Sequence, residues 1–345
     1  ISLILVIYPL TLSILFYLII NTLNYTHHFM KTLSLNIIGL GGLFSLLVSS
    51  AFAISSTPVG YVTQTISGGQ FTTFSLPLYS PTSTGTVSAV SSPVITSSGS
   101  SFGTLSDAAT PNAVKVTSGS LAGTYFPIAS NTADTITVSG DVSSLVVDDT
   151  FEVVAVDTLS SLFGDPADGA IIGGAKSVAD IIYIITSVGG WDKYFHNNSN
   201  WVQDRRGNPN ADNVQISPDS GVLISRTDPS DTSFILTGTV PSTQSVVNIN
   251  ASGFSVWPQS FPQDIELQAT GIQNVADLTS DDTLYIGTST GGWDKFFHDG
   301  TNWRQIRRGN PIADTKNIAS GSVVLLDKVT ASSNPSVTTA LPYTL

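Results

Sequence analysis

The stretch Gly189–Pro209, GGWDKYFHNNSNWVQDRRGNP, occurs a second time, with few changes, as GGWDKFFHDGTNWRQIRRGNP at Gly291–Pro311. The similarity extends upstream and downstream, since residues 180–212 align with residues 282–314 at a constant offset of 102. Of these 33 positions 22 are identical, and the alignment needs no gap. Similarity at one fixed offset indicates duplicated modules, each of which is a supersecondary unit.

Each copy has the residue pattern of a three-stranded meander. In the first copy IIYIITS is followed by a Gly-Gly turn, then WDKYFH, then a four-residue turn, then WVQDRR. The second turn reads NNSN in one copy and DGTN in the other, yet Asn-Asn and Asp-Gly both accept left-handed backbone angles. Because the two copies use different residues that accept the same backbone conformation, the pattern predicts a hairpin turn at this point.

The rest of the chain consists of short β-branched runs separated by Gly, Pro, Asn, Asp and Ser, which predicts an all-β protein. The segment DTLSSLFG is the most helical candidate. We predict an N-terminal β domain at 54–158 and two duplicated β modules, built on the meanders, at 159–256 and 257–345.

Residues 30–53 have the features of a secretory signal peptide. They begin with Met30, the only methionine of the chain, continue through an apolar run and end on a small-x-small site at Ala53. Residues 1–29 contain no acid, Lys or Arg, and we interpret them as an untranslated extension upstream of the true start. A transmembrane helix is the alternative, because their apolar run is long enough to span a bilayer.

The predicted mature chain, which begins at Ile54, has 12 basic against 25 acidic residues and thus a net charge of −13. This balance argues against nucleic acid and anionic lipid as partners. The absence of cysteine excludes disulfides, thiolate metal sites and a cysteine nucleophile. Two histidines, His196 and His298, are too few to indicate zinc. We predict no cofactor and no metal site.

Two carboxylate pairs and one serine motif are further candidates for a metal site or a catalytic site. The pairs Asp148–Asp149 and Asp281–Asp282 leave calcium open, although their spacing matches no EF-hand loop. Residues 99–103 match the pattern G-x-S-x-G, but the helix that a nucleophile elbow requires is not indicated after them. A glycosidase needs two opposed carboxyl groups, and the sequence does not show which aspartates converge. We therefore predict no catalytic residue.

The repeated phrase holds four of the five tryptophans and seven of the 12 basic residues of the mature chain. The candidate ligand-binding residues are Trp191, Lys193, Tyr194, Trp201, Arg206, Trp293, Lys295, Phe296, Trp303 and Arg308. Flat rings stack on sugar faces and arginine pairs with acids. The alternative, which we prefer, is that the rings form cross-strand core pairs covered by basic side chains, because both modules need the same core.

Several segments together resemble a known group. TPVGYVTQTISGG, IASNTADTITV, DTLSSLFG, the WDKYFH hairpin and ISPDSGVLISR are similar to an uncharacterised family of exported β-rich proteins found mainly in verrucomicrobial bacteria. The resemblance covers nearly all of the mature chain. It implies export and a shared architecture, and it brings no activity, cofactor or catalytic residue.

The function we expect is that of an exported, non-catalytic structural or adhesive β-protein, located in the periplasm, on the outer surface or outside the cell. One alternative is a carbohydrate-binding module that uses the duplicated hairpins, and another is an extracellular hydrolase. The expected partners are cell-surface polysaccharide or other envelope proteins, with membrane contact only through the export signal. Exposed tryptophan rings would favour carbohydrate binding, and buried rings would favour a structural role.

Overall fold

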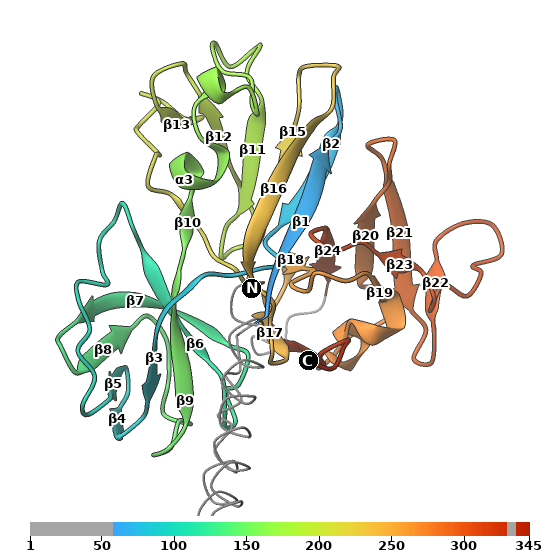
Figure 1. Cartoon of the computed structure of the whole chain (residues 1–345). Helices are drawn as coiled ribbons and strands as arrows, with labels where there is room; N and C mark the ends of the chain where they lie inside the picture. The colour runs from blue at the N-terminus through green and yellow to red at the C-terminus, as the bar shows by residue number, and fades with distance from the viewer. Residues whose placement is uncertain (1–57, 330–335) are drawn as a thin grey trace, which may run out of the picture. The chain divides into compact units, whose positions relative to one another are not determined.

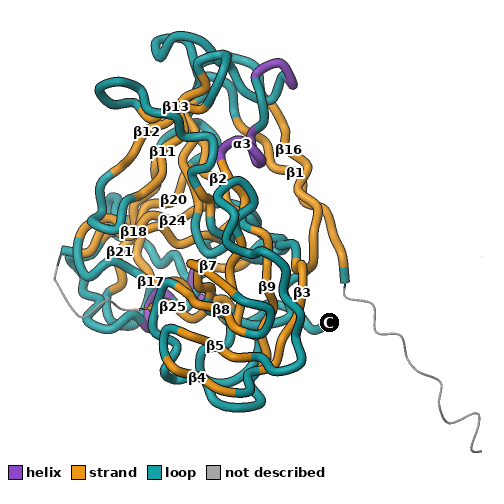
Figure 2. Tube along the Cα trace, turned by 90° about the vertical axis from the view of Figure 1, so that its left-hand side faces the viewer, coloured by secondary structure: helices purple, strands orange, loops and turns teal. Residues whose placement is uncertain are grey.

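The computed structural model describes residues 58–329 and 336–345 (Figure 1). The expectations for residues 1–29 and for the signal peptide at 30–53 lie outside the described residues. The described chain is all-β, as the sequence predicts, and its strands form antiparallel sheets. None of the helices in these two ranges is long and apolar enough to cross a membrane. Figure 2 shows how small the helical segments are beside the strands.

Both predicted meanders are present, each inside a five-stranded sheet. The first sheet has the order β13-β12-β11-β15-β2 and the second the order β22-β21-β20-β24-β18. The strands of the first are β2 (Phe71–Ser75), β11 (Ile181–Ile185), β12 (Trp191–His196), β13 (Trp201–Gln203) and β15 (Gly221–Ser225). Those of the second are β18 (Gly253–Pro258), β20 (Thr283–Gly287), β21 (Trp293–His298), β22 (Trp303–Gln305) and β24 (Val323–Lys328). The turn between the second and third meander strands has left-handed backbone at Asn198 and Gly300, as its composition predicts.

The structural repeat extends beyond the residues that align at the offset of 102. Two further strand pairs accompany each five-stranded sheet in the same chain order. In the first repeat they are β1 (Val59–Ile66) with β16 (Thr232–Thr239), and β10 (Asp157–Thr158) with β14 (Gln215–Ile216). In the second they are β17 (Ser245–Asn248) with β25 (Ser336–Thr339), and β19 (Ile265–Glu266) with β23 (Asn317–Ile318). Each repeat is therefore a nine-stranded unit.

A separate seven-stranded sheet, with the order β3-β9-β6-β7-β8-β5-β4, interrupts the first repeat between β2 and β10. Its strands are β3 (Pro81–Thr86), β4 (Ala89–Ser91), β5 (Val94–Thr96), β6 (Asn112–Val116), β7 (Tyr125–Asn131), β8 (Thr135–Val138) and β9 (Thr150–Ala155). Equivalent residues are 183 apart before this sheet (Ile66 and Ile249) and 108 apart after it (Leu159 and Leu267), so the first repeat is 75 residues longer across this interval. We call residues 81–155, which have that length, the inserted domain.

The predicted boundaries of the units are therefore wrong. Residues 54–158 do not form one N-terminal domain, because β1 and β2 pair with β16 and β15 of the first repeat. In Figure 1 the blue strand β1 runs beside the gold strand β16. The second repeat begins at β17, upstream of the predicted start at residue 257. These pairings join segments far apart in the chain, and the local residue pattern does not show them.

The short helix α3 (Leu159–Phe163) forms where the sequence predicts one. The hydroxyl of Thr158 accepts a hydrogen bond from the Ser161 amide, and the Ser161 hydroxyl accepts one from the Thr158 amide, so each side chain caps the helix start. The chain leaves the helix at Gly164. The second repeat has a single turn of 3-10 helix, η2 (Leu267–Ala269), at the same place.

Each repeat encloses its own core, and the tryptophan that begins the third meander strand is buried in it. Trp201 is 1% exposed and packs against Phe163 and His196, while its indole N–H donates to the Gly164 carbonyl. Trp303 is 2% exposed in the second core. These two rings occupy the core positions that the structural alternative requires.

Candidate functional site

The two repeats contact each other through the sheet faces that point away from their cores. On β11, Ile182 belongs to the core while its neighbour Tyr183 belongs to the cluster between the sheets, as strand alternation requires. Gly221 of the first repeat faces its own equivalent, Val323 of the second, and a Cβ on the glycine would collide with that valine. A residue that meets its own equivalent marks an approximate two-fold axis between the repeats.

A pocket of about 290 Å³ opens at this contact. Its eight lining residues are four equivalent pairs, one member from each repeat: Phe71 with Phe254, Tyr183 with Tyr285, Trp191 with Trp293, and Leu223 with Leu325. We call this site the aromatic pocket. The two halves have matching geometry, since the Phe71 and Tyr183 ring centroids are 5.6 Å apart and those of Phe254 and Tyr285 are 5.9 Å apart, each pair inclined at 53°.

The repeated Gly-Gly-Trp segment shapes this contact. Gly189 and Gly291 have left-handed φ angles of +78° and +77°, which begin the turn into the tryptophan strands. A Cβ on Gly189 would lie 3.0 Å from the Phe254 amide nitrogen, and one on Gly291 would lie 2.9 Å from the Gln70 Cβ. Each turn thus packs against the opposite repeat and sets its tryptophan at the pocket. This is a physical reason for the same phrase in both copies.

Lysines flank the pocket on both sides. The Lys193 ammonium lies 5.3 Å from the Tyr183 ring centroid, and the Lys295 ammonium lies 5.1 Å from that of Tyr285. Both lysines are exposed, and neither forms an ion pair within the described ranges. Partial burial and then the nearby Asp204 raise the pKa of Tyr183, so its phenol stays protonated at neutral pH.

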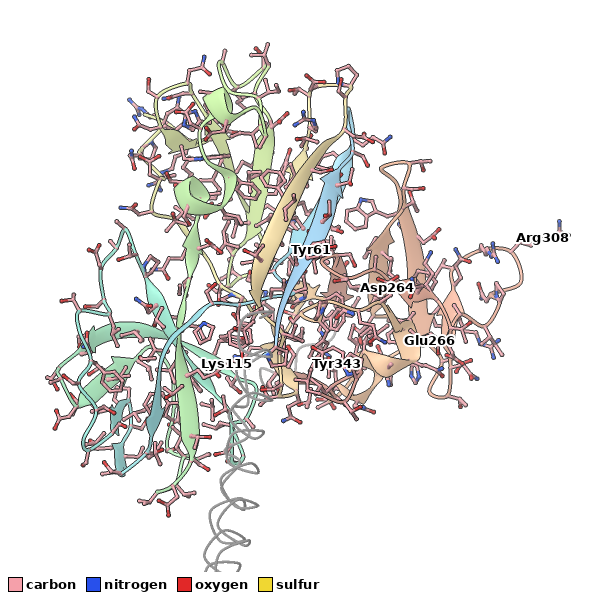
Figure 3. All side chains as sticks on the ribbon, in the orientation of Figure 1. Tyr61, Lys115, Asp264, Glu266, Arg308 and Tyr343 are labelled. Carbon is pink, nitrogen blue, oxygen red and sulfur yellow. The ribbon has the colours of Figure 1, made fainter. Side chains whose placement is uncertain are left out.

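The structure separates the ten predicted ligand residues into three groups. The aromatic pocket and its rim hold Trp191, Lys193, Trp293 and Lys295, whereas the repeat cores hold Tyr194, Trp201, Phe296 and Trp303. The core group is 1–6% exposed and does not form a ligand-facing surface. Arg206 and Arg308 lie in exposed loops after β13 and β22, and Figure 3 shows Arg308 at a loop tip. The aromatic and basic residues of the repeated phrase therefore lie in three environments: the pocket and its rim, the repeat cores, and exposed loops.

Six of the eight pocket-lining residues, all but Trp191 and Trp293, were not predicted from the sequence. Tyr183 and Leu223 match Tyr285 and Leu325 at the offset of 102, so the repeat itself carried a signal for them. Phe71 and its equivalent Phe254 are 183 residues apart, because the inserted domain separates them from the rest of the first repeat. They could be matched only through the strand pairing.

The carboxylate pairs and the serine motif singled out in the sequence do not form a site in the structure, and the carboxylates make local hydrogen bonds instead. Asp149 accepts hydrogen bonds from the Val146 amide and the Ser118 hydroxyl, and Asp282 accepts from the Val329 and Thr279 amides. No helix follows the G-x-S-x-G match before β6. Throughout the described residues, no three His, Cys, Asp or Glu side chains come close enough to hold a metal ion.

A buried lysine joins the inserted domain to the first repeat. Lys115 on β6 is 1% exposed, and its ammonium lies 3.5 Å from the Tyr79 ring centroid (Figure 3). Burial lowers the pKa of Lys115 to about 8, while nearby Glu152 opposes this shift. The Tyr79 amide and carbonyl hydrogen-bond to the Thr239 backbone, so this cluster fixes the domain onto β16.

Comparison with known proteins adds no neighbour to this description. No protein-family model, no curated protein and no solved structure matches the chain. The resemblance to a verrucomicrobial family stays an expectation from the quoted segments.

Proposed function

We propose that this chain is an exported, non-catalytic adhesive β-protein that recognises a saccharide through the aromatic pocket. The observation that carries the proposal is the pocket itself, in which six aromatic rings from two repeats meet at one opening. Five of these rings are half-buried and the sixth, Phe71, is 43% exposed, whereas Trp201 and Trp303 are enclosed. An apolar opening that keeps its rings partly in water is typical of a ligand site.

The chemistry of the pocket favours a saccharide and favours binding over hydrolysis. Flat aromatic faces pack against the C–H faces of sugar rings, while the Tyr183 and Tyr285 hydroxyls offer hydrogen bonds. None of the eight lining residues is a carboxylate. Glycoside hydrolysis ordinarily requires two opposed carboxyl groups at the scissile bond.

A purely structural role is the second candidate, and the buried Trp201 and Trp303 favour it. In that case the aromatic pocket is a packing defect at the contact between the repeats. The two candidates differ in whether the half-buried tryptophans bind anything.

Replacement of Trp191 or Trp293 by alanine is expected to weaken glycan binding by roughly 30-fold, which corresponds to a binding hot spot of about 2 kcal/mol. A glycan array identifies the ligand of the secreted chain, and calorimetry then compares the variants. The matched control is Arg206→Ala, which removes an exposed side chain outside the pocket and should bind as the wild type does. A secreted chain that recognises no glycan, or a Trp191→Ala variant with full affinity, would sink the proposal in favour of the structural role.

The export part of the proposal predicts one cleavage site. Cleavage after Ala53 should give a secreted product that begins at Ile54, because the small-x-small site ends there. N-terminal sequencing of the secreted protein checks this result. A secreted product that retains residues 1–29 would contradict both the cleavage site and the upstream-extension interpretation.

A further inference from the structure

We infer that the ligand of the aromatic pocket is an acidic saccharide whose carboxylates are held by Lys193 and Lys295. This inference rests on the proposed function, because it names the class of glycan that the same site takes. It is carried by the position of the two lysines, by the charges around them and by their two-fold arrangement.

The strand register places both lysines on the pocket side of their sheets. Lys193 is paired with Tyr183 across β11 and β12, and Lys295 is paired with Tyr285 across β20 and β21. Each lysine follows a pocket tryptophan by two residues, so strand alternation puts both on the same face. The ammonium groups therefore lie beside pocket-lining tyrosines, one on each side of the opening.

The charged groups that share this face give the rim a positive balance. Near Lys193, Lys176 is bound to Asp204 at 2.7 Å, and these two charges offset each other. At the place of Asp204 the second repeat has Ile306, since the Asp204 and Ile306 amides donate to the Lys193 and Lys295 carbonyls respectively.

One further acid, Asp327, lies on this face opposite Thr283 and Phe254. Arg304, opposite Phe297, also lies on this face, but it is bound to Asp299 at 2.6 Å and these two charges offset each other. The other charged groups named here are three lysines and two aspartates. The predicted mature chain as a whole carries −13, so this region is opposite in sign to the rest of the chain.

The ligand must satisfy both the rings and the ammonium groups. A uronic-acid saccharide has sugar C–H faces for the aromatic rings and carboxylates at its edges for the lysines. A neutral sugar would offer the ammonium groups hydroxyl oxygens but no opposite charge. Because equivalent lysines flank both sides, a chain that crosses the two-fold axis can present one carboxylate to each repeat.

The test compares oligogalacturonate with its carboxyl-reduced form, which has the same backbone with CH2OH in place of the carboxylate. Binding to the secreted chain is measured by calorimetry at low and at high salt. We expect the acidic form to bind about tenfold more tightly than the reduced form at low salt. High salt should reduce this difference in affinity, because it screens the charges. The double variant Lys193→Met/Lys295→Met should bind the two forms equally.

The matched control is Arg206→Met/Arg308→Met, which removes the same two charges from exposed loops and should keep the tenfold preference. Equal binding of both forms by the wild type, abolished by Trp191→Ala, would overturn the acidic class and leave saccharide recognition standing. If the chain binds neutral saccharides on the array but does not bind oligogalacturonate, the acidic class is likewise overturned and saccharide recognition still stands. Failure to bind any array glycan or either probe would remove the proposed function as well.

Discussion

Trp201→Ala is expected to lower the free energy of unfolding by about 3–5 kcal/mol, because it leaves a cavity at the centre of the first core. That loss is a large part of the roughly 5–15 kcal/mol that stabilises a typical domain. Trp303→Ala should have the same effect in the second core. Urea denaturation followed by circular dichroism measures both changes.

Substitution by phenylalanine separates the two tryptophans. The Trp201 indole N–H donates to the Gly164 carbonyl at 3.1 Å, whereas the Trp303 indole N–H is buried without a hydrogen-bond partner among the described residues. Trp201→Phe should therefore cost about 1 kcal/mol more than Trp303→Phe. The half-buried Trp191 is the control for cavity formation, and its replacement by alanine should be clearly milder. Equal losses at Trp191 and Trp201 would show that burial in the core does not decide the effect.

Arg226→Met is expected to destabilise the chain by about 3–5 kcal/mol, because it leaves the Asp180 carboxylate buried without its cation. The Arg226 Nη1 and an Asp180 oxygen are 3.1 Å apart, and the two side chains are 5% and 0% exposed. Asp180 also accepts hydrogen bonds from the Thr227 and Ile172 amides, so the pair ties three segments together. Thermal and urea denaturation measure the loss.

The surface ion pair Lys176–Asp204 provides the comparison. Its two charged atoms are 2.7 Å apart, closer than in the buried pair, but the lysine side chain is 54% exposed. Lys176→Met should therefore cost at most about 1 kcal/mol. A loss as large as that of Arg226→Met would mean that distance, rather than burial, sets the contribution of these pairs.

The meanders could be predicted because their information is local. Turn residues and two-residue alternation lie within each copy, and alternation alone placed Trp191 with Lys193 and opposite Tyr194. The sequence did not show which face would meet the other repeat, because that depends on where the second sheet packs. For the same reason Trp201 and Trp191, close in the chain and alike in chemistry, could not be told apart as core and pocket residues.

The inserted domain has a consequence for the order in which the chain can fold. Its strands pair only within residues 81–155. In contrast, β2 can pair only after Ser225, the partner of Phe71, has emerged, and β1 only after Thr239, the partner of Val59. A chain that emerges from its N-terminus can therefore complete the inserted sheet while β1 and β2 still lack partners. Over that interval both strands have unpaired backbone edges, the feature that promotes aggregation of nascent β-proteins. The first repeat therefore begins before the inserted domain in the chain but closes only after it.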